Sequence, residues 1–233
     1  ETLHYIIWCF TNKVVIVTGG SNGIGAATAV QFAREGAKVV IVGRNEEKLQ
    51  KVAEKCQSLN AEYHIVKADV TNENDLNRIV EETIKKYGRL DILINNAGVF
   101  KTGTIMDGQL LKIFDEIINT NLKSIVVLTS IAAPHLIKTK GNIVNITSVA
   151  GSKLITTNFL VYSTSKAALN MFTAGSAAEL ASYGVRVNSV SPGPVQTDLM
   201  KNIGLNIEDF APYTALKRVS QPDELNKLKN SQK

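Results

Sequence analysis

Cysteine, histidine and long apolar runs are all scarce in this sequence of 233 residues. The two cysteines, Cys9 and Cys56, match no metal-ligand spacing, and His4, His64 and His135 are too far apart in the chain to suggest a ligand cluster. We therefore expect no metal site. So few cysteines also favour a reducing compartment, and we expect a cytoplasmic protein in which Cys56 is a buried thiol.

Membrane and leader segments are not indicated either. The longest apolar runs are far too short to span a bilayer, so we expect no contact with a membrane. Residues 3–10 are apolar, but no basic segment precedes them and no small-residue cleavage site follows, which argues against a signal peptide. This stretch fits either a first strand or a segment foreign to the fold.

Neither sign of charge dominates the chain. The formal net charge is +5, and much of the excess lies in residues 217–233. This distribution indicates a basic tail, and we expect no nucleic-acid partner. Because 44% of the residues are hydrophobic and no repeat or linker is evident, we expect one domain over residues 1–233, with a polar tail at 225–233.

Short runs of β-branched residues alternate with segments whose apolar residues recur at helical spacing. Such alternation with short joints predicts an α/β fold, a doubly wound parallel sheet of Rossmann type with helices on both faces, in three layers. The expected strands are residues 13–17, 37–42, 62–68, 90–94, 141–146 and 185–190, and the expected helices are 26–34, 49–59, 76–87, 108–119, 120–139 and 162–183.

A glycine-rich turn joins the first expected strand to the first expected helix. Thr18 is followed by Gly19, Gly23 and Gly25, a G-x-x-x-G-x-G spacing. Glycines let a ligand approach the backbone closely, and the unpaired N–H groups of a helix N-terminus bind phosphate. The strand–turn–helix context favours a dinucleotide-binding turn over an ordinary tight turn.

Arg44 follows the second expected strand, where a dinucleotide fold faces the adenosine ribose. No acidic residue stands there to bind a free 2′-hydroxyl, and a guanidinium pairs well with a 2′-phosphate. We therefore favour NADP(H) as the cofactor, with NAD(H) as the alternative. The competing interpretation is that Arg44 is a solvated loop arginine.

Tyr162 and Lys166 are four residues apart on an expected helix, so their side chains share a face. A nearby ammonium favours the phenolate and lowers the pKa of the phenol from about 10. Such a pair can act as a general acid and base near neutral pH. As an isolated pattern, however, this spacing is weak, because most Tyr/Lys pairs four residues apart are solvated surface residues.

Further polar groups follow the other strands. Asp69, Asn96, Ser148 and residues 192–197 each come directly after a strand, and the carboxyl ends of parallel strands meet at one edge of a sheet. We therefore expect a single site at that edge. Asn121 interrupts a helical pattern, either as a polar residue at a helix junction or as a backbone kink that holds a water.

With these motifs the chain resembles the short-chain dehydrogenase/reductase superfamily, in its single-domain branch, and is similar to 3-oxoacyl-carrier-protein reductases and related carbonyl reductases. The resemblance covers about residues 12–224. Its motifs are T-G-x-x-x-G-I-G at 18–25, N-N-A-G at 95–98, Asn121, Ser148, Y-x-x-x-K at 162–166 and P-G-x-x-x-T at 192–197.

The resemblance implies a catalytic set of four residues. Tyr162 would be the acid/base, and Lys166 would lower its pKa and hold the nicotinamide ribose. Ser148 would hold the substrate carbonyl oxygen, and Asn121 would anchor a water that links Lys166 to solvent.

The resemblance also implies a cofactor site, with Asp69 at the adenine, Asn96 at the adenosine ribose, and Val195 and Thr197 at the carboxamide. The whole set expected at the cofactor is Gly19, Ser21, Asn22, Gly23, Ile24, Gly25, Arg44, Asp69, Val70, Asn96, Ala97, Gly98, Tyr162, Lys166, Pro192, Gly193, Val195 and Thr197.

The implied activity is hydride transfer between NADP(H) and a carbonyl or secondary alcohol of a hydrophobic small molecule. The segment 198–216 should cover the substrate, because it is apolar and carries little charge. The alternative is that some of its apolar residues cap the core. They are Leu199, Met200, Ile203, Leu205, Ile207, Phe210 and Tyr213.

The chain departs from the family pattern at two places. Asn22 stands where many NADP-using relatives have a basic residue, so the case for a 2′-phosphate rests on Arg44. After residue 224 the sequence becomes polar where relatives continue a helix and add a seventh strand, so we expect that strand to be lacking. An incomplete gene model, a splice form or a diverged pseudoenzyme would each explain this ending.

The second departure bears on assembly and activity. Relatives form homo-oligomers through their last helix and strand, so we expect impaired tetramer formation. The alternative function is a weakly active or inactive nucleotide-binding or regulatory protein on the same fold.

Overall fold

Six short runs rich in β-branched residues form one sheet. The computed structural model describes residues 10–199 and 205–227. Their strands are β1 (Val14–Thr18), β2 (Lys38–Gly43), β3 (Tyr63–Lys67), β4 (Ile92–Asn95), β5 (Asn142–Ile146) and β6 (Arg186–Val190). All pair in parallel, in the order β3-β2-β1-β4-β5-β6, which is the order of a doubly wound sheet. The predicted fold class is confirmed.

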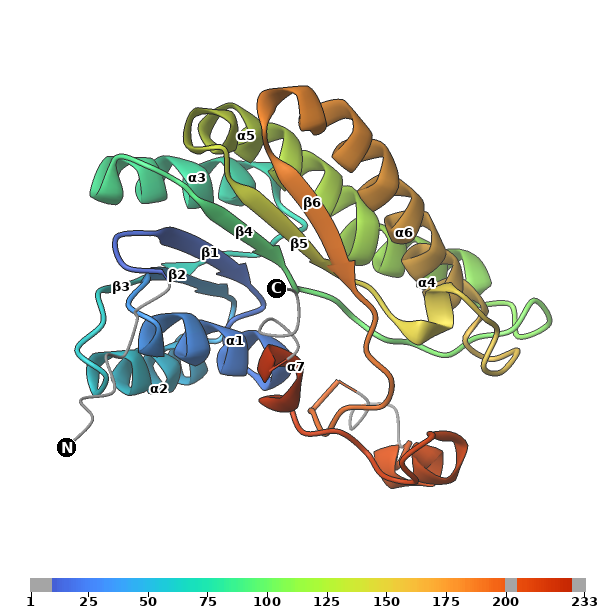
Figure 1. Ribbon diagram of the computed structural model, residues 1–233. Helices are drawn as coiled ribbons and strands as arrows, with labels where there is room; N and C mark the ends of the chain where they lie inside the picture. Colours follow the sequence, from blue (N-terminus) through green and yellow to red (C-terminus); the bar gives the residue numbers. More distant parts are fainter. Residues whose placement is uncertain (1–9, 200–204, 228–233) are drawn as a thin grey trace.

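Helices cover both faces of this sheet (Figure 1). On one face lie α1 (Gly23–Arg34), α2 (Glu46–Gln57) and the short α7 (Glu224–Lys227). On the other face lie α3 (Glu73–Tyr87), α4 (Leu110–Ile118), α5 (Ser124–Thr139) and α6 (Leu160–Leu180). The three layers agree with the sequence prediction.

The core consists of one buried cluster on each face of the sheet. Val15 and Val17 of β1 pack with Phe32 of α1, whereas Ile16 belongs to the cluster that includes Leu136 of α5. Burial of each such side chain contributes about 1.5–3 kcal/mol. Because both faces are apolar, the sheet is a rigid support for the loops at its carboxyl edge.

One long apolar helix corrects an expectation from the sequence. A π-helical turn (Asn119–Lys123) joins α4 to α5. Together Leu110–Thr139 make 30 residues, and an 18-residue window within them has a mean hydropathy of 1.2, long and apolar enough to cross a membrane by length and composition. The single apolar runs are short, but the helix joins them. Leu128, Ala132 and Leu136 of this helix are buried against the sheet, as in the core helix of a layered fold. A single helix of this kind is weak support for a span.

In the part of the chain that the structure describes, β6 forms one edge of the sheet and no seventh strand pairs with it. The predicted polar tail overlaps α7 at residues 225–227. Several expectations lie outside the described residues: those for the apolar stretch before Phe10, for His4 and Cys9, for Met200 and Ile203 of the apolar lid, and for the tail beyond Lys227.

Candidate functional site

The turn after β1 is a cradle of backbone at the N-terminus of α1. Gly19 and Gly23 have φ angles of 62° and 53°, a conformation that L-residues with a side chain rarely adopt. Gly20 N donates to Val42 O of β2 at 2.9 Å, and this bond fixes the turn to the neighbouring strand. Ser21 follows in the turn, and its hydroxyl would be 3.3 Å from a Cβ on Gly43.

Gly25 shows why the glycine turn has no room for a side chain at this position. A Cβ on Gly25 would lie 2.2 Å from Gly19 O and 2.4 Å from the Nδ2 atom of Asn96, closer than real atoms approach. Gly25 is buried and lets the turn pack closely on the first turn of α1, a helix N-terminus of the kind whose N–H groups bind phosphate. These residues fit the pyrophosphate of a dinucleotide cofactor. Ile24, by contrast, turns toward the sheet and lines a small apolar space with Ile94 and Val144.

Asn96 and Ala97 hold the turn from the side of β4. The Asn96 amide donates to Thr18 O at 2.9 Å and to Gly19 O at 3.2 Å. The main-chain N–H groups of Asn96 and Ala97 both donate to Thr18 Oγ1, at 3.0 and 3.1 Å. The side chain of Asn96 thus supports the glycine turn, and Thr18 is a supporting residue that the sequence reasoning did not single out.

Arg44 and Asp69, placed after β2 and β3, meet at the adenosine end of the expected site. The guanidinium Nη1 is 3.6 Å from Asp69 Oδ2, and the two side chains are 72% and 40% exposed. Burial alone would raise the pKa of Asp69, but hydrogen bonds from Thr71 and the charge of Arg44 bring it below its usual value. Val70, next to Asp69, is half-buried and packs against the core.

Two residues that the sequence reasoning missed adjoin the glycine turn. Asp198 accepts a short hydrogen bond from the side chain of Asn22, and the same Oδ2 atom lies 3.3 Å from Lys48 Nζ. Asn22 is also the N-cap of α1, because its Oδ1 accepts from Gly23 N at 2.7 Å. A signal for Lys48 was available, since Asn45 reads as an N-cap and places Lys48 in the first turn of the next helix.

Tyr162 lies in the first turn of α6 and is only 8% exposed. Its ring packs edge-on against Phe100, with the centroids 4.6 Å apart, and Phe100 packs in the same way against Phe159 at 4.7 Å. The phenol is therefore enclosed by an aromatic cluster. The sequence showed the pair with Lys166 but gave no sign of this enclosure.

The direction of the Tyr162 pKa differs from the expected one. Burial raises the pKa of the phenol, and a hydrogen bond with Ser148 opposes this only in part. The Lys166 ammonium was expected to lower the value, but it lies 5.8 Å from the centre of the Tyr162 ring. In this arrangement desolvation outweighs the neighbouring cation.

Lys166 is held by the sheet and not by the tyrosine. Its ammonium donates to the main-chain oxygen of Ile146 at 2.8 Å, and its side chain is 5% exposed. Burial lowers the pKa of Lys166 to about 8. A Cβ on Gly98 would lie 3.8 Å from this ammonium and 3.3 Å from Asn121 Oδ1. Gly98, Asn121 and Lys166 therefore lie close together.

Asn121 lies within the π-helical turn between α4 and α5, so it is a polar residue at a helix junction and also lies at a local departure from α-helical geometry. The helix is locally widened there, which agrees with the kink. Asn121 is fully buried, accepts from Val99 N at 2.8 Å and donates to Val99 O at 2.9 Å. Its side chain thus anchors the segment that follows β4.

Ser148 follows β5 and lies beside Tyr162. Its hydroxyl accepts from Ala150 N at 3.1 Å and caps a short 3-10 turn (Val149–Gly151). The hydrogen bond with Tyr162 brings the two hydroxyl groups to the same place. Val149 N donates to Pro192 O at 3.1 Å, so the turn after β5 is joined to the loop after β6.

The loop after β6 reaches the glycine turn. Thr197 packs on Gly23, where an added Cβ would lie 2.8 Å from its methyl group. Val195 is buried, Gly193 is exposed, and Thr197 Oγ1 accepts from Leu199 N at 3.4 Å. The structure thus places the loop after β6 beside the glycine turn, as the sequence predicts.

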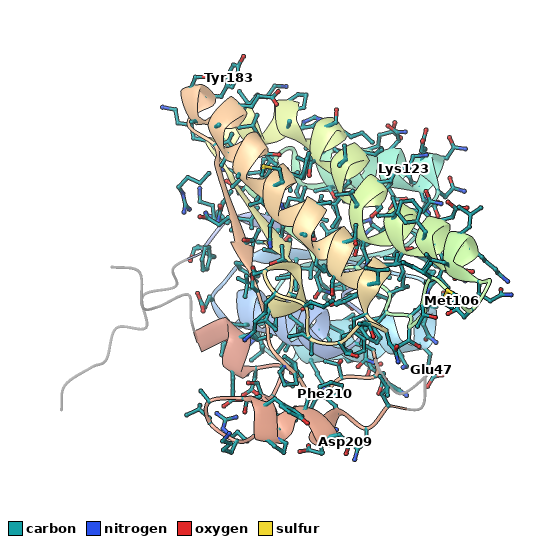
Figure 2. The ribbon with its side chains drawn as sticks, turned by 90° about the vertical axis from the view of Figure 1, so that its right-hand side faces the viewer. Glu47, Met106, Lys123, Tyr183, Asp209 and Phe210 are labelled. Carbon is teal, nitrogen blue, oxygen red and sulfur yellow. The ribbon has the colours of Figure 1, made fainter. Side chains whose placement is uncertain are left out.

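A long segment, here called the excursion, follows Val195 of this loop and ends at Ser220, beside the place where it began. Val195 and Ser220 form a parallel bridge, and Gln196 N donates to Ser220 O at 2.9 Å. The excursion carries a 3-10 helix (Ile207–Tyr213), and Figure 2 shows its Phe210 and Asp209 below the first turns of α6.

Only part of the expected apolar lid turns inward. The rings of Phe210 and Phe159 are 6.0 Å apart, and Leu205 packs on the same cluster. Tyr213 is 88% exposed, and Leu199 is 41% exposed.

Two further observations limit what the site can be. Among residues 10–199 and 205–227, no group of three His, Cys, Asp or Glu side chains could hold a metal ion. A cavity of about 380 Å³ lies along α1 and borders the glycine turn at Asn22 and Thr197, but neither Ser148 nor Tyr162 lines it.

Known proteins with the same arrangement identify the family. A family model for short chain dehydrogenases matches residues 13–208. An uncharacterised oxidoreductase of Staphylococcus saprophyticus is 36% identical over 223 residues, which cover 92% of this chain and 94% of that protein.

Solved structures agree with this match. A short-chain dehydrogenase/reductase of unknown function from Caenorhabditis elegans, solved with cofactor, has a TM-score of 0.87 at 35% identity and covers 94% of this chain and 87% of that one. A short chain dehydrogenase from Burkholderia cenocepacia in complex with NADP has a TM-score of 0.88 at 32% identity, covering 94% and 89%. The chain belongs to the short-chain dehydrogenase/reductase superfamily and is an NAD(P)-dependent oxidoreductase.

Proposed function

We propose that this oxidoreductase transfers a hydride between NADP(H) and a carbonyl or secondary alcohol group of a hydrophobic small molecule. The observation that carries the proposal is the convergence of Ser148, Tyr162, Lys166 and Asn121 at one sheet edge, beside a glycine cradle that fits a dinucleotide. Hydroxyl donors and a buried cation are the groups that stabilise a developing alkoxide.

Tyr162 is the proposed proton donor in reduction. Its raised pKa keeps the phenol protonated at neutral pH, which is the state that donation requires. The phenol of Tyr162 and the hydroxyl of Ser148 lie together, so both can donate to one carbonyl oxygen. When bound, the nicotinamide cofactor supplies or accepts the hydride.

Lys166 is the proposed link in returning a proton to Tyr162. A buried ammonium with a pKa of about 8 changes charge close to neutral pH and so can give up or take up a proton. Asn121 holds the backbone beside it, and we propose that this widened helical turn anchors a water on the proton path. Pro192, Val195 and Thr197 are proposed to contact the nicotinamide from the other side.

The preference for NADP(H) rests on Arg44. Its guanidinium is exposed at the end of β2, and no acidic residue occupies positions 43–45. A relative at 32% identity was solved in complex with NADP, which supports the proposal without deciding it. A 2′-phosphate would compete with Asp69 for Arg44.

The proposed substrate is apolar around its carbonyl group. Tyr162 is enclosed by Phe100 and Phe159, with Leu205 and Phe210 of the excursion packed on the same cluster. The side chains that pack in this cluster are aromatic or aliphatic. Substrates with a charged group next to the carbonyl would therefore be poor ones.

A substitution of Tyr162 tests the proposal. Tyr162→Phe should lose at least about a hundredfold in kcat/KM for ketone reduction while NADPH still binds. Tyr183→Phe is the matched control, because Tyr183 is 54% exposed at the opposite end of α6 (Figure 2). Retained activity in Tyr162→Phe, or tight NADPH binding by the unaltered protein without turnover of ketones and 3-oxoacyl thioesters, would reject the proposal.

A further inference from the structure

The carboxylate of Asp198 joins two segments that are far apart in the sequence. Its Oδ2 atom accepts a short hydrogen bond from Asn22 of the glycine turn and is 3.3 Å from Lys48 Nζ of α2. Because both nitrogens contact the same oxygen, the Lys48 ammonium lies beside the glycine turn. A second cation, besides Arg44, is thereby placed at the adenosine end of the cradle.

Local structure fixes the position of the Lys48 backbone. Asn45 caps α2, and its Oδ1 accepts from Lys48 N at 2.9 Å. Leu49, the next residue, is completely buried and anchors the same turn. Lys48 therefore projects from the first turn of α2, one helical turn after Arg44, and only its flexible stem decides where the ammonium goes.

The same loop abuts the glycine turn on its other side. A Cβ on Gly43 would lie 3.3 Å from Ser21 Oγ, so Arg44, the next residue, begins next to Ser21. Lys48 reaches the turn at Asn22. The two cations thus approach neighbouring residues of one turn, Ser21 and Asn22.

Both cations are paired with carboxylates in weak, exposed ion pairs. Arg44 is 3.6 Å from Asp69, and Lys48, which is 48% exposed, is 3.3 Å from Asp198, which is 41% exposed. Exposed pairs of this kind contribute only about 0–1 kcal/mol. A phosphate with nearly two negative charges and three acceptor oxygens would compete well with a single carboxylate.

We propose that Lys48 is a second cationic ligand of the 2′-phosphate of NADP(H), next to Arg44, and that Asp198 holds its ammonium at the glycine turn until the phosphate replaces the carboxylate. This inference rests on the proposed preference for NADP(H). In this inference Lys48 supplies the positive charge that a basic residue at position 22 would supply, because this chain has an asparagine at that position.

Binding of two nucleotide fragments to the full chain tests the inference without turnover. Adenosine 2′,5′-bisphosphate carries the 2′-phosphate and 5′-AMP lacks it, and calorimetry gives Kd for each. Lys48→Ala should weaken the bisphosphate about tenfold and change 5′-AMP less than about twofold. Asp198→Asn should tighten the bisphosphate, because it removes the competing charge.

Lys51→Ala is the matched control for Lys48→Ala. Lys51 lies on the same helix, is exposed and pairs with Glu47 at 2.6 Å. It should leave both affinities unchanged. Thermal melts of all variants check that the fold is kept.

The outcomes separate this inference from the proposed function. If Lys48→Ala weakens both fragments equally, or neither, Lys48 does not read the 2′-phosphate and the inference is overturned. If the unaltered protein binds both fragments equally, the preference for NADP(H) fails and the inference fails with it. If Arg44→Ala loses the discrimination but Lys48→Ala keeps it, only the inference fails.

Discussion

The ammonium of Lys166 donates a 2.8 Å hydrogen bond to the main-chain oxygen of Ile146, the last residue of β5. Helix α6 and the sheet are thereby joined by a buried cation. Burial lowers the pKa of Lys166 to about 8, and the same cause raises the pKa of the Tyr162 phenol. The pKa values of the proposed acid/base pair are therefore both shifted by desolvation.

The lowered pKa of Lys166 makes stability depend on pH. Between about 8 and 10.5 the unfolded state binds the proton that the folded state has released, so the free energy of unfolding rises with pH. Relative to Lys166→Met, the unaltered protein should gain on the order of 3 kcal/mol over this window. Urea denaturation of both proteins across the window measures the difference. A difference that stays constant with pH contradicts the lowered pKa.

The raised pKa of Tyr162 predicts different pH profiles for the two reaction directions. Reduction requires the protonated phenol, so its kcat/KM should be flat across neutral pH and fall only in alkali. Oxidation requires the phenolate, so its kcat/KM should rise with pH. Steady-state rates in both directions over the same buffers test this. A reduction rate that already falls below neutral pH would argue for a lowered pKa.

Gly25 and Gly175 form a matched pair of helical glycines. Gly25→Ala should abolish cofactor binding, because the added Cβ meets Gly19 O at 2.2 Å and the turn must shift. Gly175→Ala, in α6, has nothing within 4 Å of the added Cβ and should stabilise the protein by about 0.5–1 kcal/mol. NADPH titration and thermal melts provide the readouts. Tight NADPH binding by Gly25→Ala would show that the cradle tolerates a side chain.

Arg44 should control the choice between cofactors. Arg44→Asp replaces a cation with an acceptor for the ribose 2′-hydroxyl and adds a charge that repels Asp69 and a 2′-phosphate. The ratio of kcat/KM for NADPH to that for NADH should fall at least about tenfold. An unchanged ratio removes Arg44 from cofactor selection.

Asn121 should contribute to both stability and turnover. Asn121→Ala leaves the N–H and C=O groups of Val99 without their partners, at a cost of about 1–3 kcal/mol for each buried group left unpaired. Chemical denaturation measures this loss. Asn119→Ala is the control within the same π-helical turn, because Asn119 is exposed. Equal stability of the two variants would contradict the supporting role of Asn121.

The centre of the sheet could be predicted because β1, β2 and β4 are short apolar runs with their own boundary signals. Val14–Thr18 is buried at all five positions, and a strand buried on both faces needs no partner information to be recognised. The approach of Asn96 and Thr197 to the glycine turn followed from the rule that parallel strands end at one edge. These features depend on local pattern and topology alone.

The rest depends on contacts between distant segments. The bond from Lys48 to Asp198 spans 150 positions of sequence, and no local pattern predicts it. The direction of the Tyr162 pKa depends on burial of the phenol, and the ring that packs on it, Phe100, comes from the segment after β4. The π-helical turn at Asn119–Lys123 was visible only as a polar residue in a helix.

The bridge between Val195 and Ser220 has a consequence for how this protein can diversify. Both ends of the excursion are fastened to each other, and its contacts with the glycine turn are made by Thr197 and Asp198, close to its start. Insertions, deletions and substitutions in residues 205–218 can then accumulate with little penalty to the nucleotide cradle. Selection for a new carbonyl compound can therefore act on this segment as an exchangeable module.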